Sequence, residues 1–191
     1  MATKTRLSLE EFLALPETEP PSEYFDGEVV QKVSPNIPHS ALAAWLASRF
    51  LEWSARQEPC LVGVEGRHVS RSHNKAYLPD VHVTKRSRLV GHETESPMTV
   101  TPDVVVEVLS PEDRPSDVLR KVELYRELEV PAFLLVDPIE RSIREYRAGS
   151  PSRTYAEGDS LDLSPVLPGL VLDLAELFAV IPEPGNQSGQ R

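Results

Sequence analysis

Apolar side chains recur at the spacing of an α-helix in two long segments of the chain. From Pro38 onward the apolar positions are three or four residues apart, the repeat of one helical face, at Leu42, Trp45, Leu46, Phe50 and Trp53. Residues 114–128 show the same repeat, with one stripe formed by Lys121, Leu124, Tyr125 and Leu128. Both segments are predicted to be helices, and a proline suits the first turn because its missing N–H is unpaired there anyway.

Shorter apolar runs, bounded by turn residues, predict β-strands. Residues 23–33 have the pattern of a hairpin, with Asp26-Gly27 as its turn. The run 101–110 is the most continuously apolar, which indicates a central strand covered by helices on both faces. Further strands are predicted over residues 59–66, 67–72, 77–85 and 131–138, with edge strands over 142–148 and 153–163.

Two short helices complete the pattern near the ends of the chain. Ser8 and Glu11 have the spacing of a capping box before the first helix, and residues 168–180 end in another helix. No repeat or interdomain linker separates these elements. The sequence therefore predicts a single α/β domain over residues 1–181, with a mixed β-sheet core flanked by helices. PEPGNQSGQR (182–191) is predicted to be a disordered tail.

The composition excludes several classes of protein. The 191 residues include 30 Asp and Glu and 20 Lys and Arg, a net charge of −10, which argues against tight non-specific binding of nucleic acid. The single cysteine, Cys60, cannot form an internal disulfide or a cysteine-based zinc site. No apolar run approaches the roughly 20 residues of a membrane span, and the N-terminus MATKTRLSLEEF lacks the apolar region of a signal peptide. A cytoplasmic protein is therefore expected.

Two carboxylates are predicted to meet near the core. Glu107 lies among the last residues of the apolar run, where a carboxylate is costly to bury alone. The preceding strand, 77–85, is joined to this run by a connection without a helical pattern, so antiparallel pairing is expected. That pairing brings Asp80 beside Glu107. Asp103 lies roughly 13 Å from Glu107, at about 3.3 Å per residue along the strand, too far for the two to share one ion.

Lys121 adds a cation to this pair. A lysine on an apolar stripe requires an anionic partner, and the nearest predicted one is Glu107. Two carboxylates and a lysine at the end of a strand pair are the components of metal-assisted phosphodiester hydrolysis. Asp80 and Glu107 are predicted to bind Mg²⁺, for which Mn²⁺ can substitute, and the metal to lower the pKa of a bound water. The lysine then orients that water or stabilises negative charge. The alternative is an ion pair with a purely structural role.

Other chemistries have weaker support in the sequence. Ser110 lacks a G-x-S-x-G context, no Walker A or G-x-G-x-x-G motif is present, and the histidines lack zinc-site spacing. The most basic region is either a phosphate-facing rim or a solvated edge, and it comprises Arg67, Arg71, Lys75, Lys85, Arg86 and Arg88.

An ordered set of motifs spans most of residues 8–147. Its members are EYFDGE (23–28), the Pro38-His39 helix start, LPDVHV (78–83), PDVVVEVLSP (102–111), Asp117, Lys121, Tyr125 and VPAFLLVDP (130–138). In this combination the chain resembles the Uma-two family of restriction endonucleases, part of the PD-(D/E)XK nuclease superfamily.

The match to this family includes departures. The lysine that the superfamily usually carries two residues after the acid is replaced by Leu109, and Lys121 matches the position on the following helix to which the family moves it. Ser22 replaces a common tyrosine, and Ala132-Phe133 stands where Glu/Tyr-Tyr-Trp is usual. These changes weaken the inference about substrate more than the inference about catalysis.

The resemblance implies a restriction-endonuclease-like fold and metal-dependent hydrolysis of DNA, with Asp80 and Glu107 as the acidic pair and Lys121 as the catalytic lysine. Because cleavage of both strands needs two sites, a homodimer is expected. The candidate accessory residues, for which a solvated hairpin face or helix capping is the alternative, are Glu23, Glu28 and His39. The alternative function is a module of the same fold that binds nucleic acid or a protein partner without cutting.

Overall fold

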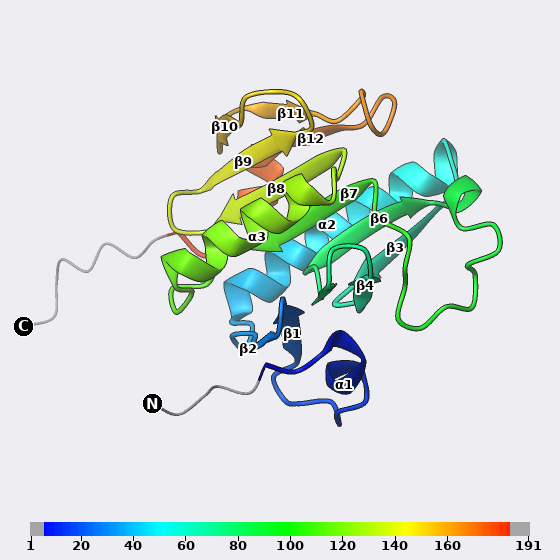
Figure 1. Cartoon of the computed structure of the whole chain (residues 1–191). Coiled ribbons are helices and arrows are strands. Elements are labelled where there is room, and N and C mark those ends of the chain that lie inside the picture. The colour runs from blue at the N-terminus through cyan, green and yellow to red at the C-terminus, as the bar shows by residue number, and fades with distance from the viewer. Residues whose placement is uncertain (1–5, 184–191) are drawn as a thin grey trace, which may run out of the picture.

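The computed structural model describes residues 6–183, whose elements form three β-sheets with α-helices packed around them (Figure 1). The helices are α1 (Leu9–Leu13), α2 (Ile37–Arg56), α3 (Pro115–Glu127) and α4 (Leu174–Phe178), with a 3-10 turn, η1 (Arg86–Arg88). The strands are β1 (Ser22–Phe25), β2 (Glu28–Gln31), β3 (Cys60–Val64), β4 (His68–Ser70), β5 (Lys75–Tyr77), β6 (Val81–Lys85), β7 (Val104–Val108), β8 (Ala132–Asp137), β9 (Ser142–Arg147), β10 (Arg153–Ala156), β11 (Ser160–Asp162) and β12 (Val171–Asp173). Within the described range, no helix has both the length and the apolar character needed to cross a membrane.

The largest sheet is mixed and has the strand order β10-β9-β8-β7-β6-β3. β7 and β8 pair in parallel, whereas the other neighbouring strands pair antiparallel. The parallel pair is possible because α3 connects the two strands as a crossover. The predicted mixed α/β core of restriction-endonuclease type is confirmed.

Alternation along β7 decides which helix each of its side chains reaches. Three of its valines belong to the core cluster that includes α2: Val104, Val106 and Val108. Val105 packs instead with Leu124 and Tyr125 of α3. Figure 1 shows α3 in front of the sheet and α2 behind it. Because side chains two residues apart share a face, Glu107 points toward α3.

A smaller sheet, in the order β2-β1-β5-β4, lies beside this face. Its first two strands form the predicted hairpin, and the turn residues Asp26 and Gly27 have φ angles of 51° and 96°. Positive φ at both central positions is the backbone of a tight two-residue turn, which explains the Asp-Gly pair. Phe25 and Val30 pack into the cluster around α3, so the hairpin and α3 face each other.

The structure corrects three of the predicted strands. The run 77–85 is divided between the two sheets, because Pro79 cannot donate to a strand ladder and the chain changes sheet at that point. Residues 142–147 form an interior strand, and the buried polar side chain of Glu145 obscures its core pattern. Residues 160–162 leave the large sheet to pair with β12. Most of the predicted tail, from residue 184 on, lies outside the described residues.

Candidate active site

A small pocket of about 60 Å³ lies where the start of β6, the end of β7, α3 and the segment after β2 meet. Three of its carboxylates are almost completely buried, with exposed fractions of 2% for Glu23, 2% for Asp80 and 3% for Glu107. Buried charges are costly unless they are paired. The pairing of these groups therefore defines the site, whose charged and titratable lining includes Glu23, Lys32, His39, Asp80, Glu107 and Lys121.

The pairing of β6 with β7 brings the two predicted carboxylates together. The strands run antiparallel with Val81 opposite Val106, so the same register continued by one residue places Asp80 opposite Glu107. The backbone N–H of Val108 donates to Asp80 Oδ2 at 2.8 Å. The predicted antiparallel arrangement is confirmed.

Asp80 accepts hydrogen bonds from two sides. Lys32 Nζ donates to Oδ1 at 2.7 Å, while His39 Nε2 lies 3.0 Å from Oδ2, which also accepts the Val108 N–H. Burial alone would raise the pKa of Asp80, but the hydrogen bond from His39 and the charges of two lysines hold that pKa well below its ordinary range. Asp80 is therefore ionised at neutral pH.

Glu107 has both of its partners on α3. Lys121 Nζ donates to Oε2 at 2.6 Å and the Tyr125 hydroxyl donates to Oε1 at 2.5 Å. These two residues are four apart in sequence, which puts them on one face of the helix. Burial raises the pKa of Glu107, and the charge of Lys121 opposes this shift without cancelling it. Burial favours a lower pKa for Lys121, but Glu107 and Glu23 raise it above its ordinary value, so the lysine stays charged.

Glu23, on β1, belongs to the same network. Its Oε1 accepts the backbone N–H of Leu78 at 2.9 Å, and its Oε2 lies 3.7 Å from Lys121 Nζ. Lys121 therefore lies between two carboxylates, one from each sheet. Of the predicted accessory residues, Glu23 and His39 line the pocket.

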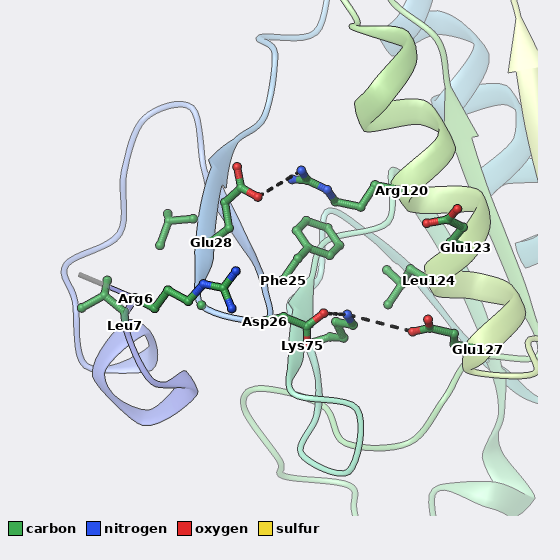
Figure 2. A pocket seen from close by; sticks show the side chains of 12 residues that line it. Arg6, Leu7, Phe25, Asp26, Glu28, Lys75, Arg120, Glu123, Leu124 and Glu127 are labelled. Carbon is green, nitrogen blue, oxygen red and sulfur yellow. Dashed lines mark hydrogen bonds and ion pairs between the residues drawn. The ribbon is translucent and has the colours of Figure 1, made fainter. Parts of the chain in front are cut away.

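Glu28, the third predicted accessory residue, lies elsewhere. It lines a neighbouring cleft of about 670 Å³ between the hairpin turn and α3, shown in Figure 2. There Arg120 donates to Glu28 at 3.1 Å. The hairpin register pairs Glu28 with Phe25 at the turn, and pairs Glu23 with Val30 further along. One face of the hairpin thus runs from the cleft to the pocket, and Glu28 is at the wrong end to reach the acidic pair.

The predicted basic region is largely paired within the chain. Asp103, at the far end of β7 from Glu107, accepts hydrogen bonds from the Lys85 N–H at 2.8 Å and from Arg88 at 2.9 Å. Arg67 donates to the carbonyl of Ser22. Among residues 6–183, the other ion pairs of this region are Arg71 with Glu10, Lys75 with Asp26 and Glu127, and Lys85 with Glu58.

Sequence reasoning missed Lys32 and the contact of Tyr125 with Glu107. Lys32 follows β2 directly, and burial would lower its pKa, but the surrounding carboxylates, led by Asp80, raise it above the ordinary value. A signal was available in the strand alternation. Lys32 shares a strand face with Val30, which pairs opposite a glutamate on the inner face of the hairpin. A lysine on that face needs an anionic partner.

The donor chemistry of the pocket fits a hard divalent cation. Mg²⁺ prefers carboxylate oxygens and keeps several waters, and the pocket offers carboxylates from Glu23, Asp80 and Glu107. Among residues 6–183, however, no three His, Cys, Asp or Glu side chains are grouped so as to hold a metal ion. The cation beside Asp80 in this structure is the Lys32 ammonium.

Comparisons with known proteins identify the family and the fold. Residues 9–175 match the Uma2 family, which is described as "Putative restriction endonuclease". The structure is similar to the crystal structure of a putative nuclease belonging to DUF820 from Anabaena variabilis ATCC 29413. The TM-score is 0.81 at 26% sequence identity, and the match covers 91% of this chain and 98% of that chain. No curated protein sequence matches. Since the family model covers most of its length, the chain belongs to the Uma2 family of putative restriction endonucleases.

Proposed function

We propose that the protein is a Mg²⁺-dependent endonuclease that hydrolyses phosphodiester bonds in DNA, with Mn²⁺ able to replace Mg²⁺. One observation carries the proposal: two buried carboxylates, Asp80 and Glu107, and the ammonium of Lys121 converge on one pocket. Membership of a family of putative restriction endonucleases supports the reaction class. In this proposal Asp80 and Glu107 are the metal ligands, and Lys121 is the third catalytic residue.

The reaction needs no covalent intermediate. A water oxygen loses a proton to solvent and forms a bond to phosphorus, the bond from phosphorus to the leaving oxygen breaks, and the leaving oxygen takes up a proton from solvent. The metal, when bound, supplies acidity to that water and neutralises charge on the phosphate. Lys121 adds a fixed positive charge beside Glu107, where it orients the water or stabilises the negative charge that develops.

Tyr125 and His39 act as positioning residues in this proposal. Tyr125 donates from α3 to Glu107, and His39 contacts Asp80 from the first turn of α2. Each carboxylate is thereby fixed by a helix as well as by the sheet that carries it. Such fixation keeps catalytic groups within the narrow range of positions that rapid chemistry requires.

A second candidate function is a module that binds nucleic acid or a protein partner without cutting. The observation that favours it is that both carboxylates already have partners within the chain: Asp80 is hydrogen-bonded to Lys32 and His39, and Glu107 to Lys121 and Tyr125. A buried network of this kind also occurs as a purely structural feature.

The test is nicking of supercoiled plasmid DNA with Mg²⁺ or Mn²⁺, compared with DNA binding in EDTA. Glu107→Gln should abolish nicking, because it removes a charged metal ligand. The matched control is Glu145→Gln, which neutralises another buried glutamate, bonded to Arg147 and Tyr155 on the far side of β8. Its nicking activity should persist. DNA binding by the wild type without metal-dependent nicking would favour the non-cleaving module.

A homodimer belongs to the same proposal, because one pocket serves one strand. Dimerisation predicts linear plasmid as an early product and a two-chain mass by light scattering at the assay concentration. A monomer that accumulates only nicked circles would contradict it.

A further inference from the structure

Lys32 occupies one side of Asp80. Its Nζ donates to Asp80 Oδ1 at 2.7 Å and to the carbonyl of Leu78 at 2.9 Å, and only 8% of its side chain is exposed. The other carboxylate oxygen is engaged by His39 and by the Val108 N–H. A divalent ion bound at Oδ1 would therefore have to take the place now held by the Lys32 ammonium.

The formal charges of the pocket support such an exchange. Its three buried carboxylates, Glu23, Asp80 and Glu107, face the two ammonium groups of Lys32 and Lys121, which leaves one negative charge among these buried groups. Asp113 and Asp117 also line the pocket, but both are partly exposed, so solvent screens their charges. With a divalent ion in place of the Lys32 ammonium, the single charge of Lys121 and the double charge of the ion balance the three carboxylates. With Lys32 still in place, the same ion would leave an excess of positive charge in a buried site, which is costly.

The position of Lys32 in the fold makes its departure feasible. It directly follows β2, an edge strand that pairs with β1 alone among the strands of residues 6–183 and has three of its four residues exposed. Leaving the pocket breaks one ion pair and one hydrogen bond without separating any strand of the large sheet.

We propose that Lys32 is a built-in counter-ion that competes with the divalent metal for Asp80 and leaves the pocket when the metal binds. The inference rests on the proposed metal site at Asp80 and Glu107. It makes Lys32 a determinant of metal affinity: the pocket is kept ordered and nearly neutral without metal, and the metal must displace an ammonium to enter. If Lys32 had a purely structural role, its removal would instead weaken metal binding, because Asp80 would no longer be held in place.

The experiment is isothermal titration of the intact protein with Mn²⁺ at neutral pH and fixed ionic strength. Lys32→Met should bind Mn²⁺ at least about tenfold more tightly than the wild type, because the wild type must first give up the attraction between the Lys32 ammonium and Asp80, and two opposite charges in contact attract by more than this even at an effective dielectric of ~20. Lys32→Arg keeps the charge and should stay close to the wild type. The matched control is Lys85→Met, which removes a partly buried lysine paired with Glu58 at the other end of β6. Equal or weaker binding by a folded Lys32→Met overturns the proposal.

A second measurement covers the case in which Lys32→Met does not fold. In the wild type, the NMR signal of the Lys32 ammonium should be protected from solvent exchange without metal, and should lose that protection on addition of Mg²⁺. Retained protection at saturating Mg²⁺ overturns the proposal. The outcomes separate this inference from the proposed function. If Lys32 competes with the metal but the protein does not cleave DNA, the counter-ion role stands and the nuclease proposal fails. If the protein cleaves DNA with Mg²⁺ but Lys32→Met has the metal affinity of the wild type, the nuclease proposal stands and the counter-ion role fails.

Discussion

Replacing Tyr125 by phenylalanine isolates one contact of the acidic pair. The Tyr125 side chain is 1% exposed and its hydroxyl donates to Glu107 Oε1 at 2.5 Å, so the substitution deletes a single hydrogen bond to a buried carboxylate. Hydrogen bonds to charged groups contribute about 1.5–3 kcal/mol, and a buried acceptor left unsatisfied costs a comparable amount. We therefore expect Tyr125→Phe to lower the free energy of unfolding by about 2 kcal/mol at pH 8. In a chain of this size that loss corresponds to a melting temperature lower by about 4–8 °C.

The stability lost in Tyr125→Phe should depend on pH. Burial already raises the folded-state pKa of Glu107, and deleting a donor to its ionised form raises it further. A folded-state pKa above the unfolded value means that the folded protein binds a proton that the unfolded chain does not, so stability increases as the pH falls through that pKa. The difference between wild type and Tyr125→Phe should therefore be largest at pH 8 and should shrink toward pH 5.5.

Urea unfolding at these two pH values measures both effects. The control is Tyr77→Phe, because Tyr77 is equally buried and packs edge-on against Tyr125 at 5.8 Å, yet its hydroxyl makes no side-chain hydrogen bond to any other part of residues 6–183. A Tyr125→Phe penalty below about 0.5 kcal/mol at pH 8, where a bond to a charged group should count most, or one that grows on acidification, would refute the reasoning.

Three further predictions concern other charged or titratable groups. Burial lowers the pKa of His68 to about 3 and that of His82 to about 4, so below about pH 6.5 the unfolded chain binds protons that the folded protein does not bind. Between pH 7 and 5 the free energy of unfolding of the wild type should therefore fall by about 2 kcal/mol more than that of His68→Gln, as measured by urea unfolding. Asp80→Asn should eliminate the rise in melting temperature that Mn²⁺ causes, whereas Asp103→Asn should keep that rise and lose about 1–2 kcal/mol of stability with its bonds to Lys85 and Arg88. Lys121→Met should bind Mn²⁺ at least as tightly as the wild type, while its nicking rate should fall by orders of magnitude. An unchanged nicking rate would mean that Lys121 is only a structural partner of Glu107.

The fold was predictable where local patterns are strong. The stripe from Lys121 to Leu128 and the unbroken valines before Glu107 identified α3 and β7, and the lack of a helix between two strands correctly indicated antiparallel pairing. The division of residues 77–85 between two sheets was not predictable in this way. Apolar alternation continues across Pro79, and the change of sheet depends on pairing with the distant hairpin.

The candidate site was predictable as far as strand register extends. Strand register brought Asp80 to Glu107, and helical spacing placed Lys121 on the stripe that faces Glu107. Alternation places Lys32 on the inner face of the hairpin but does not identify its partner, because the contact with Asp80 spans 48 residues and depends on how the two sheets pack. Glu28 was included because it lies in the same motif as Glu23. It lies beside the turn of the hairpin, however, whereas Glu23 lies further from the turn, on the part of the hairpin that reaches the pocket.

Diffraction from crystals soaked in Mn²⁺ would show whether Asp80 and Glu107 bind the metal, because anomalous scattering locates the ion without reference to activity. We expect a single strong peak in the pocket, bonded to carboxylate oxygens of Asp80 and Glu107, with Lys121 still bonded to Glu107 and the Lys32 ammonium turned away from Asp80. A peak outside this pocket, or a pocket that remains without metal at saturating Mn²⁺ with Lys32 still bonded to Asp80, would contradict it.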